Sequence, residues 1–179
     1  SLLFSPDVQN KITEVAPINA RMFRAWLEAK PQPINIMQVC MPTADTHEEE
    51  VRGHYRRLTE EVEKTPGKER IIIMGDFNAK IGNNTEHPAC GKHGLGEQNE
   101  RGEMLLDWMR DNNLIAVNTC FRHRNKQKYT WISPGGEHRN MIDYVITRKR
   151  NINDCHDSRA LVSADCATDH QMVWAKIKG

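Results

Sequence analysis

The stretch Ile71-Ile72-Ile73-Met74-Gly75-Asp76-Phe77-Asn78 decides the expected fold and indicates where the chemistry lies. Its four consecutive apolar residues are typical of a strand that is buried on both faces. Alternation along an extended chain sends Asp76 and Asn78 to one side and Phe77 to the other, so an acid and an amide can converge at the strand's mouth. A plain turn uses the same residue types, and this interpretation stays open for Asp76 and Asn78 taken alone.

Neighbouring segments place this strand among other strands and helices. Strands are predicted at residues 34–39, 70–74, 114–117, 129–132, 142–146, 161–162 and 172–177. Helices are predicted after a cap at Asp45 or Thr46 and from near Asn99, because apolar residues recur there at helical spacing. Strands joined both by helices and by a hairpin-like turn favour a layered α/β (α+β) sandwich, with mixed sheets and flanking helices.

Length and composition indicate a single domain over residues 1–179, because 38% hydrophobic residues suffice for one sizeable core. Basic and acidic residues number 25 and 24, which excludes a broadly cationic surface. The five cysteines have no paired spacing and favour a reducing compartment, so we expect a nuclear or cytoplasmic protein. No apolar stretch approaches the roughly 18 residues that cross a bilayer, and no membrane partner is expected.

Two further polar groups follow downstream, each beside an apolar segment. One contains Asp143, within residues 140–144, and the other contains Asp169 and His170. A carboxylate and an imidazole at a strand mouth provide a metal ligand and a proton donor, which phosphodiester hydrolysis needs. A buried Asp143 that accepts a hydrogen bond from His170 would fix the tautomer of the imidazole and keep it protonated. An ordinary loop before the last strand is the plainer interpretation of Asp169 and His170.

A local basic patch is the candidate contact for a polyanion. Arg122, Arg124, Lys126 and Lys128 occupy every second position, which would line one face of an extended ribbon. We expect these side chains, with Trp131 nearby, to contact nucleic acid. A solvated strand and turn would have the same pattern.

A rival metal site would use zinc. Its candidate ligands lie three residues apart at His87, Cys90 and His93, and could be joined by residues 155–156. The intervening Pro88 argues against a helical face, so the spacing is loose for a zinc site.

Taken together and in this order, the motifs resemble the endonuclease/exonuclease/phosphatase superfamily. They are most similar to the apurinic-like endonuclease domains of RTE-type (BovB) non-LTR retrotransposons. Host proteins that captured such a domain, like the ruminant bucentaur (craniofacial development protein 2) relatives, are similar in the same way. The resemblance spans nearly the whole chain and rests on residues 75–80, 91–96, 99–102, 129–134, 141–144 and 169–170.

The resemblance implies a Mg²⁺-dependent phosphodiesterase, with Mn²⁺ as a substitute ion, that nicks DNA by in-line attack of water. It implies that Asp76 orients or deprotonates the water and that Asn78 holds the water and the phosphate. It also implies that Asp169 lies near the metal, and that His170, steered by Asp143, stabilises the developing charge.

Three departures from the family pattern bear on activity. The family's early Asn and metal-binding Glu would lie upstream of Ser1, so we expect an N-terminally truncated domain that holds the C-terminal half of the family fold. Cys40 stands where relatives have Tyr, and Thr168 stands where they have Ser. A truncated fold would expose an apolar sheet face, so we expect self-association through that face.

Two other functions stay open. The first is a catalytically inactive protein-interaction module in a host protein, which loss of the upstream groups and of the Tyr would favour. The second is a sugar-phosphate or inositol phosphatase, which shares the motifs and differs in what the surrounding loops admit. The basic residues between 122 and 128 favour a polymeric substrate over this second alternative.

Overall fold

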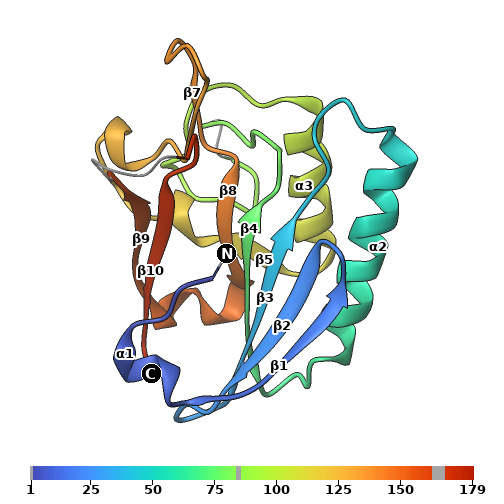
Figure 1. Cartoon of the computed structure of the whole chain (residues 1–179), viewed down its shortest axis with the longest axis vertical. Helices are drawn as coiled ribbons and strands as arrows, with labels where there is room; N and C mark the ends of the chain where they lie inside the picture. Colours follow the sequence, from blue (N-terminus) through green and yellow to red (C-terminus); the bar gives the residue numbers. More distant parts are fainter. Residues whose placement is uncertain (1, 84–85, 163–167) are drawn as a thin grey trace.

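The computed structural model describes residues 2–83, 86–162 and 168–179, which form a mixture of helices and strands (Figure 1). The helices are α1 (Pro6–Gln9), α2 (Glu48–Lys64) and α3 (Glu100–Asp111), with 3-10 turns η1 (Val117–Thr119), η2 (Asn125–Gln127) and η3 (Lys149–Asp154). The strands are β1 (Ile12–Asn19), β2 (Met22–Leu27), β3 (Ile34–Cys40), β4 (Arg70–Asp76), β5 (Leu114–Ala116), β6 (Trp131–Ile132), β7 (Arg139–Asn140), β8 (Asp143–Arg148), β9 (Cys155–Leu161) and β10 (Met172–Ile177).

Six strands form the main sheet, in the order β1-β2-β3-β4-β8-β5. β3 and β4 are parallel, because the chain crosses over through α2 between them, and the other neighbours in this sheet are antiparallel. β9 and β10 form a second sheet of two strands, and β6 and β7 form a short hairpin. α2 and α3 cover one face of the main sheet, and β9 and β10 lie against the other (Figure 1). The predicted layered α/β fold with mixed sheets and flanking helices is confirmed.

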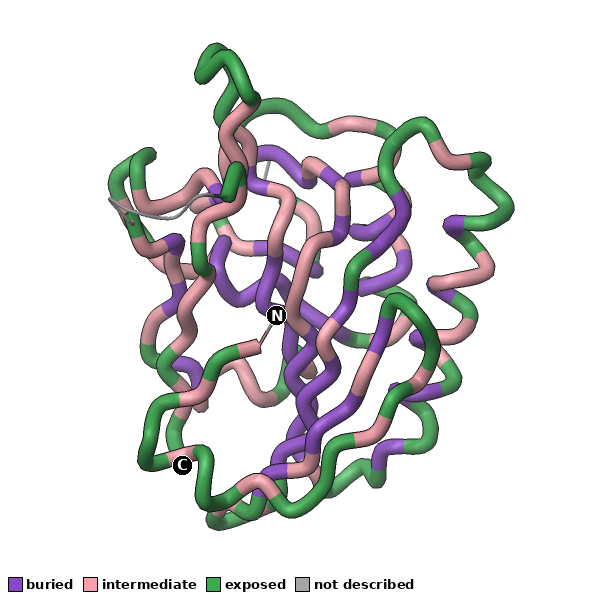
Figure 2. Tube along the Cα trace, viewed as in Figure 1, coloured by how far each residue is buried: buried purple, intermediate pink, exposed green. Residues whose placement is uncertain are grey.

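The apolar run of β4 supplies both cores of the protein. Ile71 and Ile73 pack in the core beneath α2 and α3, whereas Ile72 packs in the core on the side of β9 and β10. All three are at most 4% exposed, and Figure 2 shows the buried strands running through the centre of the molecule. Burial of each such side chain contributes roughly 1.5–3 kcal/mol, so β4 is a main source of stability.

The two long helices form where the apolar spacing predicts them, although one cap differs. Asn99 caps α3 as predicted, because its Oδ1 accepts a hydrogen bond from the N–H of Gly102 at 2.8 Å. α2 begins later than predicted and is capped by His47, whose Nδ1 accepts from the N–H of Glu49 at 3.3 Å. Asp45 does not cap the helix, because its carboxylate binds the hydroxyl of Thr43 instead.

Several strands lie where local sequence does not predict them. β1 and β2 were not predicted, because β1 is an edge strand with mostly exposed residues and β2 carries a buried arginine. β9 was predicted only at residues 161–162 but begins at Cys155. Its sequence is largely polar, and antiparallel pairing with β10 makes it a strand.

Gly75 permits the close approach of β3 to β4. Its φ of +143° is rarely adopted by other residues, and a Cβ at this position would lie 1.9 Å from the carbonyl oxygen of Val39. A side chain at residue 75 would therefore push the two strands apart. The glycine keeps Asp76 in register opposite Cys40 on β3.

Tyr144 fastens the segment after β4 to the sheet. Its hydroxyl lies 2.7 Å from the carbonyl oxygen of Met141 and accepts a hydrogen bond from the N–H of Ile81 at 3.2 Å. The residue is only 1% exposed, so water does not replace these contacts readily.

Replacing Tyr144→Phe should therefore lower the free energy of unfolding by about 1–3 kcal/mol, because the buried N–H of Ile81 loses its acceptor. Urea denaturation measures the change. Tyr129→Phe is the matched control, since Tyr129 is half-buried and its hydroxyl has no hydrogen bond among the described residues. Its stability should change by less than about 0.5 kcal/mol. Equal losses in the two variants would contradict this role for Tyr144.

Candidate active site

Asp76 and Asp143 lie directly opposite each other at one end of the main sheet. Asp76 is the last residue of β4, Asp143 is the first residue of β8, and the antiparallel register pairs them. His170 lies just before β10 and forms a β-bridge with Trp131. Sheet pairing thus brings together three residues that are far apart in the sequence.

These three side chains are close enough to act as one unit. Nδ1 of His170 lies 2.9 Å from Oδ2 of Asp143, and its Nε2 lies 3.7 Å from Oδ2 of Asp76. One ligand atom from each residue lies within 4.8 Å of the other two. The predicted contact between Asp143 and His170 is therefore present. All three residues are half-buried, so the cluster is open to solvent on one side.

Backbone contacts that the sequence did not predict hold Asp143 in place. The hydroxyl of Thr130 accepts hydrogen bonds from the N–H groups of Ile142 and Asp143, both at 3.0 Å. The side chain of Asn118 donates to the carbonyl of Asp143 at 3.1 Å and accepts from the N–H of Val145 at 3.2 Å. Thr130 lies within residues 129–134, which carry part of the family resemblance. Nothing in the local sequence marks Asn118, because its hydrogen-bond partners lie on a distant strand.

Asn78 approaches Asp76 through a turn, which corrects the expectation based on strand alternation. β4 ends at Asp76, and Asn78 has a positive φ of 47°, so the extended conformation does not continue. The N–H of Asn78 donates to Oδ1 of Asp76 at 2.8 Å, and its side-chain amide donates to the carbonyl of Met41 at 2.8 Å. Phe77 is 2% exposed and anchors the turn in the core, as predicted.

Burial and charge shift the acid–base properties of this cluster. Burial raises the pKa of Asp76 to about 6, and the neighbouring carboxylate of Asp143 adds to this effect. The hydrogen bond from His170 to Asp143 raises the pKa of the imidazole, although burial opposes the shift. Crowded carboxylates beside an imidazole that favours its charged form are typical of catalytic and metal-binding sites.

Asp169 and Trp131 contact each other at the edge of the cluster. The indole N–H of Trp131 donates to Oδ2 of Asp169 at 2.9 Å. Asp169 is exposed, and the group of three close ligand residues does not include it. Its predicted place near a metal stays a prediction.

The predicted basic ribbon does not adopt the expected extended form. Asn125–Gln127 form the 3-10 turn η2, because the N–H of Gln127 bonds the carbonyl of Arg124 at 2.8 Å. Alternate residues therefore do not share one face there. Arg122, Arg124 and Lys126 are exposed, whereas Lys128 is half-buried and its ammonium lies 3.4 Å from the carbonyl oxygen of Gly94.

The rival zinc site does not form among the described residues. Within residues 2–83, 86–162 and 168–179, Asp76, Asp143 and His170 are the only group that brings three ligand atoms together. Nδ1 of His87, one of the candidate zinc ligands, accepts a hydrogen bond from the N–H of Ala89 at 3.2 Å.

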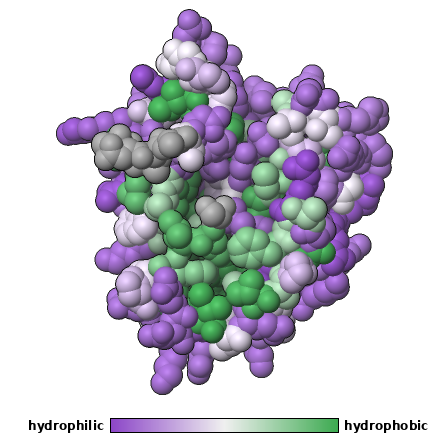
Figure 3. Space-filling view, viewed as in Figure 1, coloured by the Kyte–Doolittle hydropathy of each residue, from purple (hydrophilic) through white to green (hydrophobic). Residues whose placement is uncertain are grey.

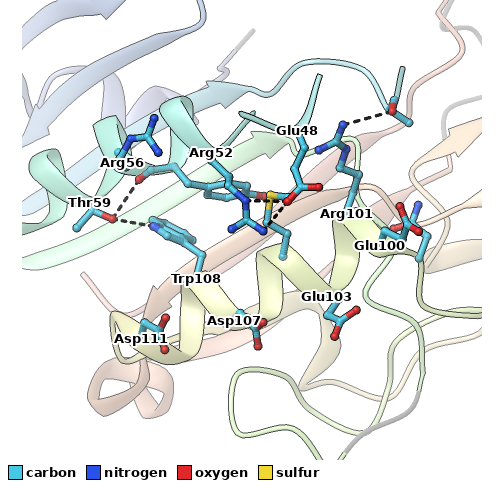
Figure 4. Close-up of a pocket in the computed structure, with 14 residues that line it drawn as sticks. Glu48, Arg52, Arg56, Thr59, Glu100, Arg101, Glu103, Asp107, Trp108 and Asp111 are labelled. Atoms are coloured by element: carbon cyan, nitrogen blue, oxygen red, sulfur yellow. Dashed lines mark hydrogen bonds and ion pairs between the residues drawn. The ribbon is translucent and has the colours of Figure 1, made fainter. Parts of the chain in front are cut away.

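A groove of about 1000 Å³ lies between α2 and α3 (Figure 4). Some of its charged side chains form ion pairs along the helices, as with Arg52 and Glu48 at 2.6 Å. The indole N–H of Trp108 donates to the hydroxyl of Thr59 at 2.9 Å. The groove contains none of the three clustered residues.

Comparison with known proteins identifies a matching family and two curated relatives. The sequence profile of a family described as Endonuclease-reverse transcriptase matches residues 34–174. The chain is 36% identical to craniofacial development protein 2 of Tragulus javanicus and 35% identical to that of Bos taurus, over 99% of its own length. It spans 31% and 30% of the length of these curated relatives.

Solved structures share the fold. The endonuclease domain of TRAS1, a telomere-specific non-LTR retrotransposon, superimposes with a TM-score of 0.66 at 13% identity, over 92% of this chain and 67% of that one. The AP endonuclease of Leishmania major gives a TM-score of 0.68 at 9% identity, over 97% and 64% of the two chains. At sequence identities this low, the likeness shows a shared fold and nothing more. The shared fold is that of the endonuclease/exonuclease/phosphatase superfamily.

Asp143→Asn should lower the pKa of His170, because it removes the carboxylate that contributes most to the upward shift. The shift can be followed by NMR titration of the imidazole. Asp169→Asn is the matched control and should have a smaller effect, since Asp169 is the weakest contributor. Equal shifts in both variants, or none in either, would contradict the role of Asp143.

The same pKa shift predicts a pH dependence of stability. Because folding raises the pKa of His170, protonation of this imidazole stabilises the folded state. The full contribution is present at pH values below the pKa of histidine in the unfolded chain, which is about 6.5. That contribution is lost as the pH rises through the pKa of His170 in the folded state. The decline in free energy of unfolding above pH 6.5 should therefore be smaller in Asp143→Asn than in the unsubstituted protein, which urea denaturation at several pH values measures.

Proposed function

Because the chain belongs to the endonuclease-reverse transcriptase family, we propose that it is a divalent-metal-dependent phosphodiesterase that nicks DNA. The observation that carries the proposal is the cluster of Asp76, Asp143 and His170, whose ligand atoms lie within 4.8 Å of one another. Two carboxylates and an imidazole at the end of a sheet are the groups that such a reaction requires. The structural neighbours named as endonucleases support the same reaction class.

His170 stabilises the charge that develops on the phosphate in this proposal. Its Nδ1–H donates to Asp143, which fixes the tautomer and favours the imidazolium form. The Nε2–H then remains as a charged donor for a phosphate oxygen. Hydrogen bonds from a charged donor are stronger than neutral ones, so they stabilise a transition state whose charge increases.

Asp76 is proposed to orient the attacking water or to deprotonate it. Its pKa of about 6 lies close to neutral pH, where it is largely ionised and can still accept a proton from water. Asn78 holds this carboxylate through its backbone N–H and fastens the loop after β3 through its side chain. Contact of Asn78 with the water or the phosphate stays a prediction.

The two facing carboxylates fit a hard divalent cation such as Mg²⁺, or Mn²⁺ in its place. Their mutual repulsion contributes to the raised pKa of Asp76, and a bound cation would relieve that repulsion and lower this pKa. With a cation bound, Asp76 would orient the attacking water rather than accept its proton. Such an ion, when bound, polarises the phosphate and lowers the pKa of coordinated water. Asp169 is proposed to contribute from the exposed edge of the site.

DNA is proposed to approach over the β6–β7 hairpin. The hairpin stands beside the cluster, because Trp131 on β6 bridges His170, and it projects from the end of the sheet (Figure 1). Exposed Arg139 lies over the ring of Tyr129, with 5.5 Å between the guanidinium carbon and the ring centroid. Arg122, Arg124 and Lys126 add nearby positive charge that would bind phosphates without reading sequence.

The proposal also covers the evolutionary origin of the domain and its location in the cell. We propose that the domain derives from a retrotransposon endonuclease, which the likenesses to craniofacial development protein 2 and to the TRAS1 domain support. We further propose that it acts in the nucleus or cytoplasm. Among the described residues, no helix is both long and apolar enough to cross a membrane.

We also propose that a second copy of the chain covers the apolar surface beside β9 and β10. Figure 3 shows apolar side chains gathered near the centre of this face. Leu3 is 71% exposed and Met172 is 44% exposed, while Phe4 and Val173 are only partly buried against the core. An exposed surface of this kind favours association.

Nicking of supercoiled plasmid by the purified protein with Mg²⁺ tests the catalytic proposal. Asp76→Ala and His170→Ala should each lower the rate at least about 10²-fold, because each removes a group that acts on the transition state. His123→Ala is the matched control. Its imidazole also pairs with an aspartate, Asp157 at 2.6 Å, but lies outside the cluster. Activity should therefore be retained.

Two outcomes would contradict the catalytic proposal. Equal nicking by all variants would indicate a contaminating nuclease. No nicking by any protein, the unsubstituted one included, would favour a catalytically inactive interaction module. The exposed thiol of Cys40 opposite Asp76 is consistent with that alternative, because the resembling domains have a tyrosine there.

Sedimentation velocity tests the second-copy proposal at protein concentrations on the order of tens of micromolar. The unsubstituted protein should sediment as a dimer, and the double substitution Leu3→Ser with Met172→Ser should shift it to a monomer. Val15→Ser is the matched control, because Val15 is 59% exposed but lies on the edge strand β1. A compact, soluble monomer of the unsubstituted protein would rule this association out.

A further inference from the structure

A row of residues crosses the end of the main sheet from the clustered carboxylates to an exposed arginine. Asp143 begins β8 and Asp76 ends β4, and the register pairs these two residues. Cys40 ends β3 opposite Asp76. The row continues to Arg21, directly before β2, because the N–H of Cys40 donates to the carbonyl of Arg21 at 2.9 Å. These four residues therefore lie at the ends of four consecutive strands.

Arg21 projects from the same face of the sheet as the carboxylate of Asp76. Met22, the next residue along the chain, packs in the core beneath α2 and α3. Side chains alternate between the two faces, so Arg21 projects from the other face. Asp76 also projects from that face, because Met74, two residues earlier, packs on the side of β9 and β10.

The spacing of strands gives the separation between Arg21 and the cluster. Neighbouring strands lie roughly 4.8 Å apart, so two strand spacings place the backbone of Arg21 about 10 Å from that of Asp76. A DNA strand advances roughly 3.4 Å per nucleotide along the duplex axis, so about 10 Å corresponds to at most about three nucleotides. A strand with one phosphate at Asp76 can therefore have another phosphate at Arg21.

The guanidinium of Arg21 has donors available for a phosphate. One of them, on Nη1, contacts the carbonyl of Cys40 at 3.4 Å, and the backbone N–H of Arg21 donates to Oδ1 of Asn19 at 2.8 Å. Arg21 is exposed, and it has no ion pair among the described residues. A guanidinium has five N–H donors, so most of them remain free.

Exposed arginines on α2 differ from Arg21 in this respect. Arg52 pairs with Glu48 at 2.6 Å, and Arg56 pairs with Glu49 at 2.8 Å. A phosphate that approached either guanidinium would also meet the paired carboxylate. Arg21 offers its positive charge without such a competitor.

Arg21 and the β6–β7 hairpin lie on opposite sides of the cluster. The hairpin is joined to the cluster through the bridge between Trp131 and His170, and it carries exposed Arg139. In Figure 1 the hairpin rises on one side of the end of β4, and the turn between β1 and β2 lies on the other. Positive side chains therefore flank the cluster on both sides.

We propose that Arg21 binds a phosphate of the cleaved DNA strand, on the far side of the scissile bond from the hairpin. This inference rests on the proposed phosphodiesterase function and specifies its substrate as a phosphodiester inside a strand, with nucleotides bound on both sides. Arg21 contacts the substrate away from the reacting atoms. It contributes affinity and position in every sequence, because phosphate contacts do not read bases.

Binding of a short DNA duplex to the full chain tests the contact separately from catalysis. Fluorescence anisotropy measures the affinity at several salt concentrations, with EDTA present to remove the metal needed for cleavage. Arg21→Gln should weaken binding at least about threefold and reduce the slope of log affinity against log salt by about 0.9, the value for one lost phosphate contact. Arg21→Lys should keep the slope of the unsubstituted protein, because it keeps the charge.

Arg150→Gln is the matched control for the loss of one exposed arginine. The guanidinium of Arg150 also donates to a backbone carbonyl, that of Gly67, but it lies at the opposite end of the sheet, where β4 begins. The salt slope of this variant should equal that of the unsubstituted protein. Equal slopes in Arg21→Gln and the unsubstituted protein would overturn the proposal, as would a loss of slope in Arg150→Gln of the same size as in Arg21→Gln.

Nicking of supercoiled plasmid with Mg²⁺ gives a second readout. Arg21→Gln should raise KM at least about threefold and change kcat by less than about twofold, because the lost contact holds the strand rather than the reacting phosphate. A fall in kcat with KM unchanged would overturn this role. The two assays also separate the proposals: a reduced salt slope without nicking by any protein supports the contact and contradicts catalysis, whereas nicking with unchanged slopes does the reverse.

Discussion

The site depends on one constraint, which is the repulsion between the facing carboxylates of Asp76 and Asp143. Like charges directly opposite each other on neighbouring strands are destabilising, and burial strengthens their repulsion. Two features offset this cost. His170 lies between the carboxylates and favours its charged form, and Asp76 has a pKa raised to about 6. An arrangement that opposes folding is also one that favours positive charge at this point, either a cation or the imidazolium of His170.

The scaffold holds this unfavourable arrangement mainly through hydrogen bonds between side chains and the backbone. Gly75 allows β4 to lie close to β3, and Tyr144 fastens the segment that follows β4. Thr130 and Asn118 hold the start of β8 from two other segments. Because Tyr144, Thr130 and Asn118 are buried and hydrogen-bonded, the carboxylates sit on a rigid sheet rather than on loops. Rigid elements keep catalytic groups in place more accurately than loops do.

The same sheet carries a different chemistry at each end. Near Asp76 the polar groups are charged, close together and partly open to solvent. Near Asn35 the charges that line a cleft are balanced, and the side chains of Arg24 and Asn35 are buried. Parallel pairing of β3 with β4 sets this separation, because it places the starts of both strands together and their ends together.

The sequence by itself determined the buried strand β4, the two long helices and the polar residues that follow the strands, because apolar periodicity records which face of an element is buried. Its resemblance to a known family also pointed to the contact between Asp143 and His170. Only the tertiary structure decided that β9 is a strand, that residues 125–127 turn, and that Trp26 lies opposite Asn35. These features depend on register and on pairing between distant segments, which local sequence does not encode.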